Sequence, residues 1–146
     1  METLLKIVQT VNMYSTLGFL LIAQGDQTGD YQKALDFNRK AYDYDDTDAS
    51  IVDNLGQVLY RTGEIEEAEK VFEKALSIKP TQFDTLYFLS RIRISQDRVE
   101  EARKMLDTAL DKTYSVFNTV PRENAIELAR SIGMDLSVYD DISAEN

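Results

Sequence analysis

Cysteine and histidine are both absent from this 146-residue chain. Without cysteine the chain can form neither disulfides nor thiolate metal sites. Without histidine it lacks the commonest general base and the commonest metal ligand in proteins. These two absences exclude much of enzyme chemistry. We therefore expect a protein that is not an enzyme, with no catalytic residues, no cofactor and no metal site.

Proline and long apolar runs are scarce as well. Only Pro80 and Pro121 interrupt the chain, and each stands where a helix is expected to begin or end. The longest apolar run, residues 17–23, is about a third of the roughly 20 residues that a helix needs to span a bilayer. The first two residues, Met1 and Glu2, do not supply a basic start for a signal peptide. The sequence thus predicts neither a membrane span nor a signal peptide.

The charge is strongly acidic, with 16 basic residues, 26 acidic residues and a net charge of −10. A surface of this sign repels phosphate backbones at long range, and the basic residues form no run. We expect a cytoplasmic protein that binds neither nucleic acid nor membranes. A hydrophobic content of 43% excludes a wholly disordered chain.

One stretch, residues 49–82, has a clear internal pattern. The small residues of the pattern are Gly56, Ala68 and Ala75, and large apolar residues lie between them. The other residues that fit the pattern are Val52, Leu55, Leu59, Phe72 and Pro80. This stretch resembles the tetratricopeptide repeat, a helix–turn–helix unit of 34 residues that carries small residues at close helix contacts.

The pattern recurs on both sides of this stretch. Residues of the same type follow 34 positions later, namely Leu86, Leu89, Ala102, Leu106 and Ala109. Ala34 and Ala41 precede their counterparts by 34, but Leu17 and Gly18 precede theirs by 38. The four inserted residues coincide with a doubled turn signal, Gln24 to Asp26 and Thr28 to Asp30. Repeat one therefore has either a lengthened first helix or a longer turn.

The resemblance implies an all-α fold, a right-handed α-solenoid of three repeats within a single domain, 1–146. The repeats cover about residues 11–48, 49–82 and 83–116, followed by a capping helix near 121–132 and an acidic tail, 134–146. The apolar periodicity predicts helices near 3–24, 31–44, 49–61, 65–77, 82–95, 98–112 and 121–132. At the N-terminus either the first helix starts early, or residues 2–10 are the remnant of a preceding repeat.

An acidic cluster, residues 43–48, invites a calcium interpretation. An EF-hand loop needs Gly at its sixth position and Glu at its twelfth, where this chain has Asp48 and Asn54. The motif fails. We interpret the cluster as a solvated turn between repeats in which Asp48 caps the next helix.

The resemblance also implies a binding surface, because members of this family typically hold a partner's peptide or helix on a concave face lined by the first helix of each repeat. Matching repeat positions place on that face Asn12, Ser15, Phe19, Ile22, Asp53, Gln57, Tyr60, Arg61, Asp84, Tyr87, Arg91 and Ile94. The predicted partner-binding residues are Phe19, Asp53, Gln57, Tyr60, Arg61, Tyr87 and Arg91. Aromatic and arginine side chains are enriched at binding hot spots, so we expect apolar anchors from the aromatic residues and an acidic ligand group at the arginines.

Co-chaperone members of the family hold a chaperone's C-terminal carboxylate with a clamp of Lys, Asn and Arg. The matching positions here are Ser15, Phe19, Asn54, Asp84 and Phe88, of which only Asn54 agrees. We therefore expect no such clamp.

Two hypotheses remain for the function. The first is an adaptor or scaffold that binds a protein or peptide partner in the concave groove. The alternative is a structural assembly module, a homo-oligomer that self-associates through its end repeats or its convex face. The tail residues Asp140, Asp141 and Glu145 add the hypothesis that the acidic tail folds back onto Arg61 and Arg91 as an internal competitor.

Overall fold

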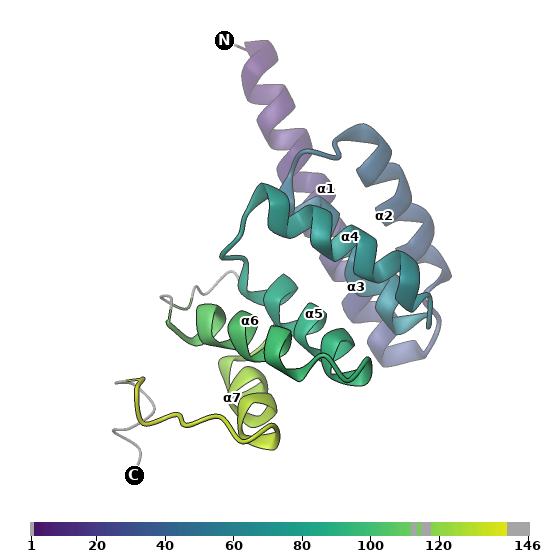
Figure 1. The fold of residues 1–146 in the computed structure, drawn as a ribbon. Helices are drawn as coiled ribbons and strands as arrows, with labels where there is room; N and C mark the ends of the chain where they lie inside the picture. The colour runs from purple at the N-terminus through teal and green to yellow at the C-terminus, as the bar shows by residue number, and fades with distance from the viewer. Residues whose placement is uncertain (1, 112–113, 115–117, 140–146) are drawn as a thin grey trace. The chain divides into compact units, whose positions relative to one another are not determined.

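The structure, a computed structural model, describes residues 2–111, 114 and 118–139, with side chains placed from residue 10 onward (Figure 1). Within these ranges the chain forms seven α-helices and no β-strand. They are α1 (Glu2–Thr28), α2 (Gln32–Tyr44), α3 (Ala49–Arg61), α4 (Ile65–Ile78), α5 (Phe83–Ser95), α6 (Val99–Asp111) and α7 (Arg122–Ser131). The predicted all-α fold is confirmed, and each predicted helix is present.

The chain divides into two compact units, Met1–Pro80 and Thr81–Asn146. Unit 1 contains α1 to α4, and unit 2 contains α5 to α7. In each unit the helices are antiparallel neighbours joined by short turns, since α1 packs on α2, α3 on α4 and α5 on α6. This is the helix–turn–helix pairing that the 34-residue spacing predicts.

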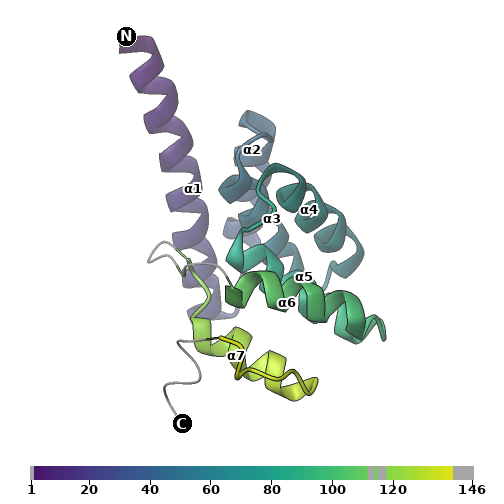
Figure 2. The same ribbon diagram turned by 60° about the vertical axis from the view of Figure 1, so that its left-hand side comes forward.

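Helix α1 is the longest element, with 27 residues against 13 in α3. It runs without a break from Glu2 through Gly25, and it ends where Gly29 adopts a φ of +78°. The Gly25-Asp26 pair, which the sequence suggested as a turn, is therefore helical. Of the two alternatives for repeat one, the lengthened first helix is correct. Figures 1 and 2 show the N-terminal part of α1 projecting beyond α2.

The close contacts between paired helices lie at the predicted small residues. All six alanines of the 34-residue series have an exposed fraction of 2% or less, namely Ala34, Ala41, Ala68, Ala75, Ala102 and Ala109. In the α3–α4 pair, a Cβ on Gly56 would lie 2.5 Å from the ring of Phe72. Only glycine leaves room for this ring. The 34-residue series of small residues thus coincides with buried positions of the paired helices.

In the α1–α2 pair, a polar residue occupies the position that corresponds to Phe72. Asn38 stands 34 positions before Phe72 and is fully buried. Its Nδ2 donates to the backbone carbonyl of Ala34 at 2.8 Å and to that of Gly18 at 3.3 Å. A Cβ on Gly18 would lie 2.2 Å from the Asn38 Oδ1 atom, so this glycine is also required by a close approach.

In unit 2, α7 is held from both ends of α6. The Nη2 atom of Arg122 donates to the carbonyl of Leu110 at 3.0 Å, and the Nη2 atom of Arg103 donates to the carbonyl of Ile132 at 2.6 Å. Ala125 and Ala129 are fully buried where α7 packs against α6. Pro121 is the N-cap of α7 rather than its first helical residue.

The carboxylate of Asp84, at the start of α5, fixes the segment that leads into α7. It accepts hydrogen bonds from the backbone N–H of Thr119 at 2.9 Å, from the Thr119 hydroxyl at 2.7 Å and from the N–H of Val120 at 3.0 Å. Tyr114 donates its hydroxyl to the carbonyl of Val120 and stacks edge-on against Phe83. The start of α5 is thereby connected to the segment that precedes α7.

None of the helices in the described part of the chain combines the length and the apolar character that crossing a membrane requires.

Candidate functional site

The predicted partner-binding residues of unit 1 lie on α1 and α3. Asp53, Gln57 and Arg61 follow one another at intervals of four, which places them on one face of α3. Asp53 and Gln57 are buried, with exposed fractions of 3% and 1%. Phe19, Tyr60 and Arg61 are half-buried. The structure therefore makes these last three side chains the accessible part of the predicted set in unit 1.

A hydrogen-bonded ladder joins the three polar residues of α3. The Nε2 atom of Gln57 donates to Asp53 Oδ2 at 2.7 Å. The Nη1 atom of Arg61 reaches both the side-chain oxygen and the backbone carbonyl of Gln57, at 3.3 Å each. The ladder runs from a buried carboxylate to a half-exposed guanidinium and holds Arg61 in one orientation.

Asp26 completes this ladder, and sequence reasoning missed it. Its carboxylate accepts from Arg61 Nε at 2.7 Å and from Nη2 at 3.3 Å, in a bidentate pair, and from the Tyr31 hydroxyl at 2.7 Å. Asp26 lies in the additional helical turn of α1, and an insertion of four residues is about one turn of helix. The 38-residue spacing was the available signal, because it lengthens α1 by the turn that carries Asp26.

The electrostatics of this pair favour the ionised carboxylate. Burial acts to raise the pKa of Asp26, but the hydrogen bonds from Arg61 and Tyr31 and the charge of Arg61 outweigh it, so that the pKa lies below its ordinary value. The hydrogen bond to Asp26 raises the pKa of Tyr31. An acidic ligand group that approaches Arg61 must therefore compete with a carboxylate of the protein itself.

The predicted residues of unit 2, Tyr87 and Arg91, form a pair of their own. Arg91 is exposed and donates from Nη1 to the Tyr87 hydroxyl at 3.0 Å, with its guanidinium 5.8 Å from the centre of the Tyr87 ring. Tyr87 itself is 6% exposed and lies edge-on to Phe88. Of this pair, Arg91 is thus the accessible residue, and the buried Tyr87 holds its guanidinium in place.

The predicted set therefore falls into one group in each unit. Asp53, Gln57 and Tyr87 are buried, whereas all were expected at the surface of a groove. Asp84, which was expected to line the groove, is also buried and accepts hydrogen bonds from Thr119 and Val120. Ile22, another expected groove residue, is 1% exposed. The tail residues Asp140, Asp141 and Glu145 lie outside the described residues.

The acidic cluster at residues 43–48 has the structural role that the sequence predicts. Asp48 caps α3 by accepting from the N–H of Ile51 at 2.9 Å. Asp45 accepts from the N–H and the hydroxyl of Thr47, and Asp46 pairs with Lys74 at 2.7 Å. Among the residues that the structure describes, no group of three acidic side chains is arranged to hold a metal ion.

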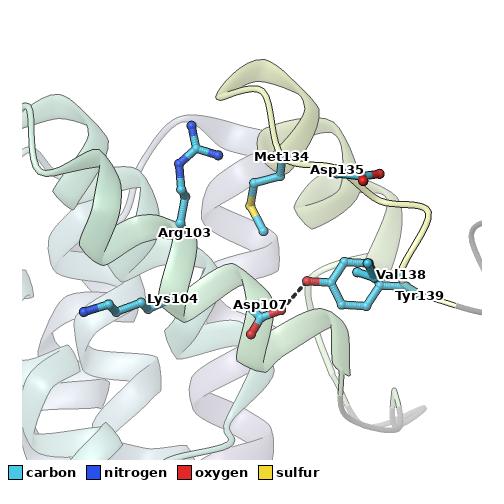
Figure 3. A pocket seen from close by; sticks show the side chains of 7 residues that line it. All are labelled: Arg103, Lys104, Asp107, Met134, Asp135, Val138 and Tyr139. Carbon is cyan, nitrogen blue, oxygen red and sulfur yellow. Dashed lines mark hydrogen bonds between the residues drawn. The ribbon is translucent and has the colours of Figure 1, made fainter.

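A shallow hollow of about 330 Å³ lies between α6 and the segment that follows α7 (Figure 3). It is lined by Arg103, Lys104, Asp107, Met134, Asp135, Val138 and Tyr139. Tyr139 donates its hydroxyl to Asp107 at 2.5 Å, and burial together with this hydrogen bond raises the pKa of Tyr139. These contacts fasten the segment after α7 to α6.

Comparison with known proteins agrees with these repeats. Two family models described as tetratricopeptide repeat match the chain, one over residues 9–81 and the other over residues 67–115. No curated protein sequence matches the chain.

Among solved structures, the chain is similar to the type III secretion translocator chaperone SycD of Yersinia enterocolitica. The alternative dimer of SycD matches with a TM-score of 0.60 at 17% identity over 94% of both chains. Another SycD structure matches with a TM-score of 0.62 at 15% identity, over 86% of this chain and 89% of that one. SycD in complex with a peptide of the translocator YopD matches with a TM-score of 0.60 at 15% identity, over 94% and 95%. At these identities the similarity shows the fold, an all-α repeat solenoid.

Proposed function

The chain belongs to the tetratricopeptide repeat family, and from this premise we propose that it is a protein-binding module that holds a peptide or helix of a partner protein against the first helices of its repeats. A protein of similar fold, SycD, has been crystallised with a peptide of its translocator. The absence of cysteine and histidine supports a binding role rather than a catalytic one.

The observation that carries this proposal is the placement of accessible aromatic and arginine side chains on these first helices. Phe19 and Tyr60 are half-buried, so each combines a fixed position with a surface that a partner can cover. Arg61 is held by the ladder on α3, and Arg91 is held over Tyr87. Side chains that are already ordered lose less entropy on binding, which favours them as hot spots.

The contacts of Arg61 refine the chemistry of the partner. Asp26 occupies the bidentate position on Arg61 that a ligand carboxylate would take. The side chain of Asp26 is 44% exposed, so it can move aside into water. We propose that an aspartate or glutamate of the partner replaces Asp26 at Arg61, while the partner's apolar side chains cover Phe19 and Tyr60.

A peptide-display selection on the full chain tests this proposal. The selected peptides are synthesised with a fluorophore, and their affinity is measured by anisotropy. Tyr60→Ala should weaken binding by at least tenfold, which corresponds to about 1.4 kcal/mol. Arg91→Glu should weaken acidic peptides by a similar factor.

Arg130→Glu is the matched control, because Arg130 is an exposed arginine on α7 that lies outside the proposed surface. It makes the same change of charge and should leave affinity within twofold. If the control and the two test variants weakened binding equally, the effect would be one of net charge, and the proposed surface would be wrong. Selection of peptides that bind all variants as tightly as the wild type would also overturn it.

A further inference from the structure

Three large apolar side chains form an exposed line along α1. Met13, Leu17 and Leu20 have exposed fractions of 59%, 42% and 52%. Their spacing of four and then three residues places them on one side of the helix. The opposite side of α1 carries Gly18 and Ile22, which are buried. We call Met13, Leu17 and Leu20 the α1 stripe.

The positions of the α1 stripe are buried in both later repeats. The counterparts 38 residues later, on α3, are Ile51, Leu55 and Val58, with exposed fractions of 0%, 3% and 0%. The counterparts on α5 are Thr85, Leu89 and Ile92, at 0%, 0% and 1%. In unit 1, α3 packs against α2, the second helix of the preceding repeat. The stripe is thus a surface that this repeat architecture normally covers with another helix.

The charge pattern indicates what can cover it. No charged residue occurs from Ile7 to Gly25, although charged residues make up 29% of the chain and its net charge is −10. Two copies of so acidic a protein repel each other over most of their surface. We expect the repulsion to be weakest along this uncharged length of α1. Burial of its exposed apolar side chains would there lower the free energy of association.

The stripe is also complementary to itself. If two α1 helices pack antiparallel about a twofold axis near Leu17, Met13 of one copy faces Leu20 of the other, and the two Leu17 side chains meet. Helix α1 has 27 residues and is therefore about 40 Å long, and its N-terminal part projects beyond α2 (Figure 2). We propose that the α1 stripe is the interface of a homodimer in which two copies pair through α1.

Analytical ultracentrifugation across a concentration series tests the dimer. The wild type should form dimers, and its dissociation constant should fall as salt is raised, because salt screens the repulsion between two acidic copies. Leu17→Glu and Leu20→Glu should each raise the dissociation constant by about 100-fold, since each buries two uncompensated charges in the interface. Val138→Glu is the control, because Val138 is 67% exposed and lies far along the sequence from α1; it should leave the dissociation constant unchanged.

Cross-linking tests the geometry independently of any effect on folding. Since the chain contains no cysteine, Leu17→Cys and Val138→Cys each introduce a single thiol. Under mild oxidation Leu17→Cys should form a covalent dimer at least tenfold faster than Val138→Cys. A wild type that stays monomeric at 100 μM, or equal cross-linking rates for the two variants, would overturn the proposal. So would a dimer that Leu17→Glu and Leu20→Glu leave intact, because its interface would lie elsewhere.

Discussion

At the scale of single residues, the three helix pairs share one contact and make it with different side chains. The facing residues are Gly18 and Asn38 in the first pair and Gly56 and Phe72 in the second. The 34-residue spacing assigns Ser90 and Leu106, which are both buried, to the same positions in the third. Ser90 is buried and donates its hydroxyl to the carbonyl of Leu86 at 2.6 Å. Between the second and third pairs, the larger Ser90 in place of glycine is accompanied by the smaller Leu106 in place of phenylalanine, as close packing requires. The first pair departs from this trend, because Gly18 faces the smaller, polar Asn38.

This complementarity predicts a strong coupling between Gly56 and Phe72. Gly56→Ser alone should destabilise unit 1 by about 1–3 kcal/mol, because its Cβ would overlap the Phe72 ring. Phe72→Leu alone should cost on the order of 1 kcal/mol through lost packing. The double variant has the same two residue types as Ser90 and Leu106. Its loss of stability should be smaller than the sum of the two single losses by at least about 0.5 kcal/mol. Urea unfolding of the four proteins measures this coupling, and strictly additive losses would contradict it.

Asp26 gives a second prediction at this scale. Asp26→Asn removes the negative charge that competes for Arg61, so an acidic peptide selected on the wild type should bind the variant more tightly, by about threefold to tenfold. Stability should fall by only about 0.2–1 kcal/mol, because the pair is partly exposed. Anisotropy titration measures the affinity, and an aspartate-to-alanine change in the peptide should abolish the gain.

The control for this prediction is Glu67→Gln, which removes the same charge from another bidentate arginine pair, Arg39 and Glu67. It should leave peptide affinity unchanged. If Glu67→Gln tightened binding as much as Asp26→Asn, the gain would come from lower net charge and not from freeing Arg61.

At the scale of helices, the sequence predicted most boundaries to within a residue or two, because the caps are local. Asp48 caps α3, and Gly133 follows the end of α7 with a φ of +76°. The end of α1 was wrong by four residues, since Gly25 sits inside the helix against the ring of Tyr31. Whether a glycine ends a helix or permits a close contact depends on tertiary packing, which a single sequence does not display.

The candidate site was less predictable for the same reason. Repeat spacing placed Asp53, Gln57 and Tyr87 on the inner side of their helices, but their burial depends on which side chains cover them. The neutralisation of Arg61 depends on Asp26, a residue 35 positions away on another helix. The α1 stripe was not recognised either, because Leu17 matches the repeat pattern whether or not another helix covers it.

The anchoring of α7 by Asp84 gives the prediction at this scale. Asp84→Ala would leave the N–H groups of Thr119 and Val120 without their acceptor in a largely buried setting. Each buried donor left unsatisfied costs about 1–3 kcal/mol, so unit 2 should lose about 2–4 kcal/mol. Hydrogen exchange should show faster exchange of these two amides.

Glu127→Ala, a change at an exposed position of α7, is the control and should leave both measures unchanged. If Asp84→Ala did not speed exchange at Thr119 and Val120, the segment before α7 would be held by other contacts.

At the scale of the whole molecule, the chain carries a net charge of −10. The stability of a repeat protein rests on contacts between neighbouring helices. In the described part of unit 1, ion pairs join separate helices or their connecting turns. Arg61 pairs with Asp26, Arg39 with Glu67, and Lys74 with Asp46. In unit 2, Glu101 pairs with Arg98 and lies 3.7 Å from Arg93. Some of the acidic side chains are thus paired with basic ones where helices meet.

These pairs predict how stability depends on pH. For Glu67, Asp46 and Glu101, hydrogen bonds from Arg39, Lys74 and Arg98 respectively are the largest influence and lower the pKa. The pKa of Asp26 is lowered too, against the effect of burial. A carboxylate with a lowered pKa in the folded state binds fewer protons than in the unfolded chain. Its contribution is therefore complete above the unfolded pKa of about 4 and is lost as pH falls through the folded pKa.

We accordingly expect the free energy of unfolding to fall as the pH is lowered below about 4, with the larger loss in unit 1, which holds Asp26, Asp46 and Glu67, whereas unit 2 holds Glu101 and Asp135, whose pKa is lowered by hydrogen bonds from Ser137. Urea unfolding followed by amide NMR signals from each unit, at pH values between 2.5 and 7, measures both effects. Glu67→Gln should reduce the acid-induced loss in unit 1 and leave that of unit 2 unchanged, because its side chain no longer titrates. Stability that rose on acidification would mean that relief of the repulsion among the 26 acidic residues outweighs the loss of these pairs.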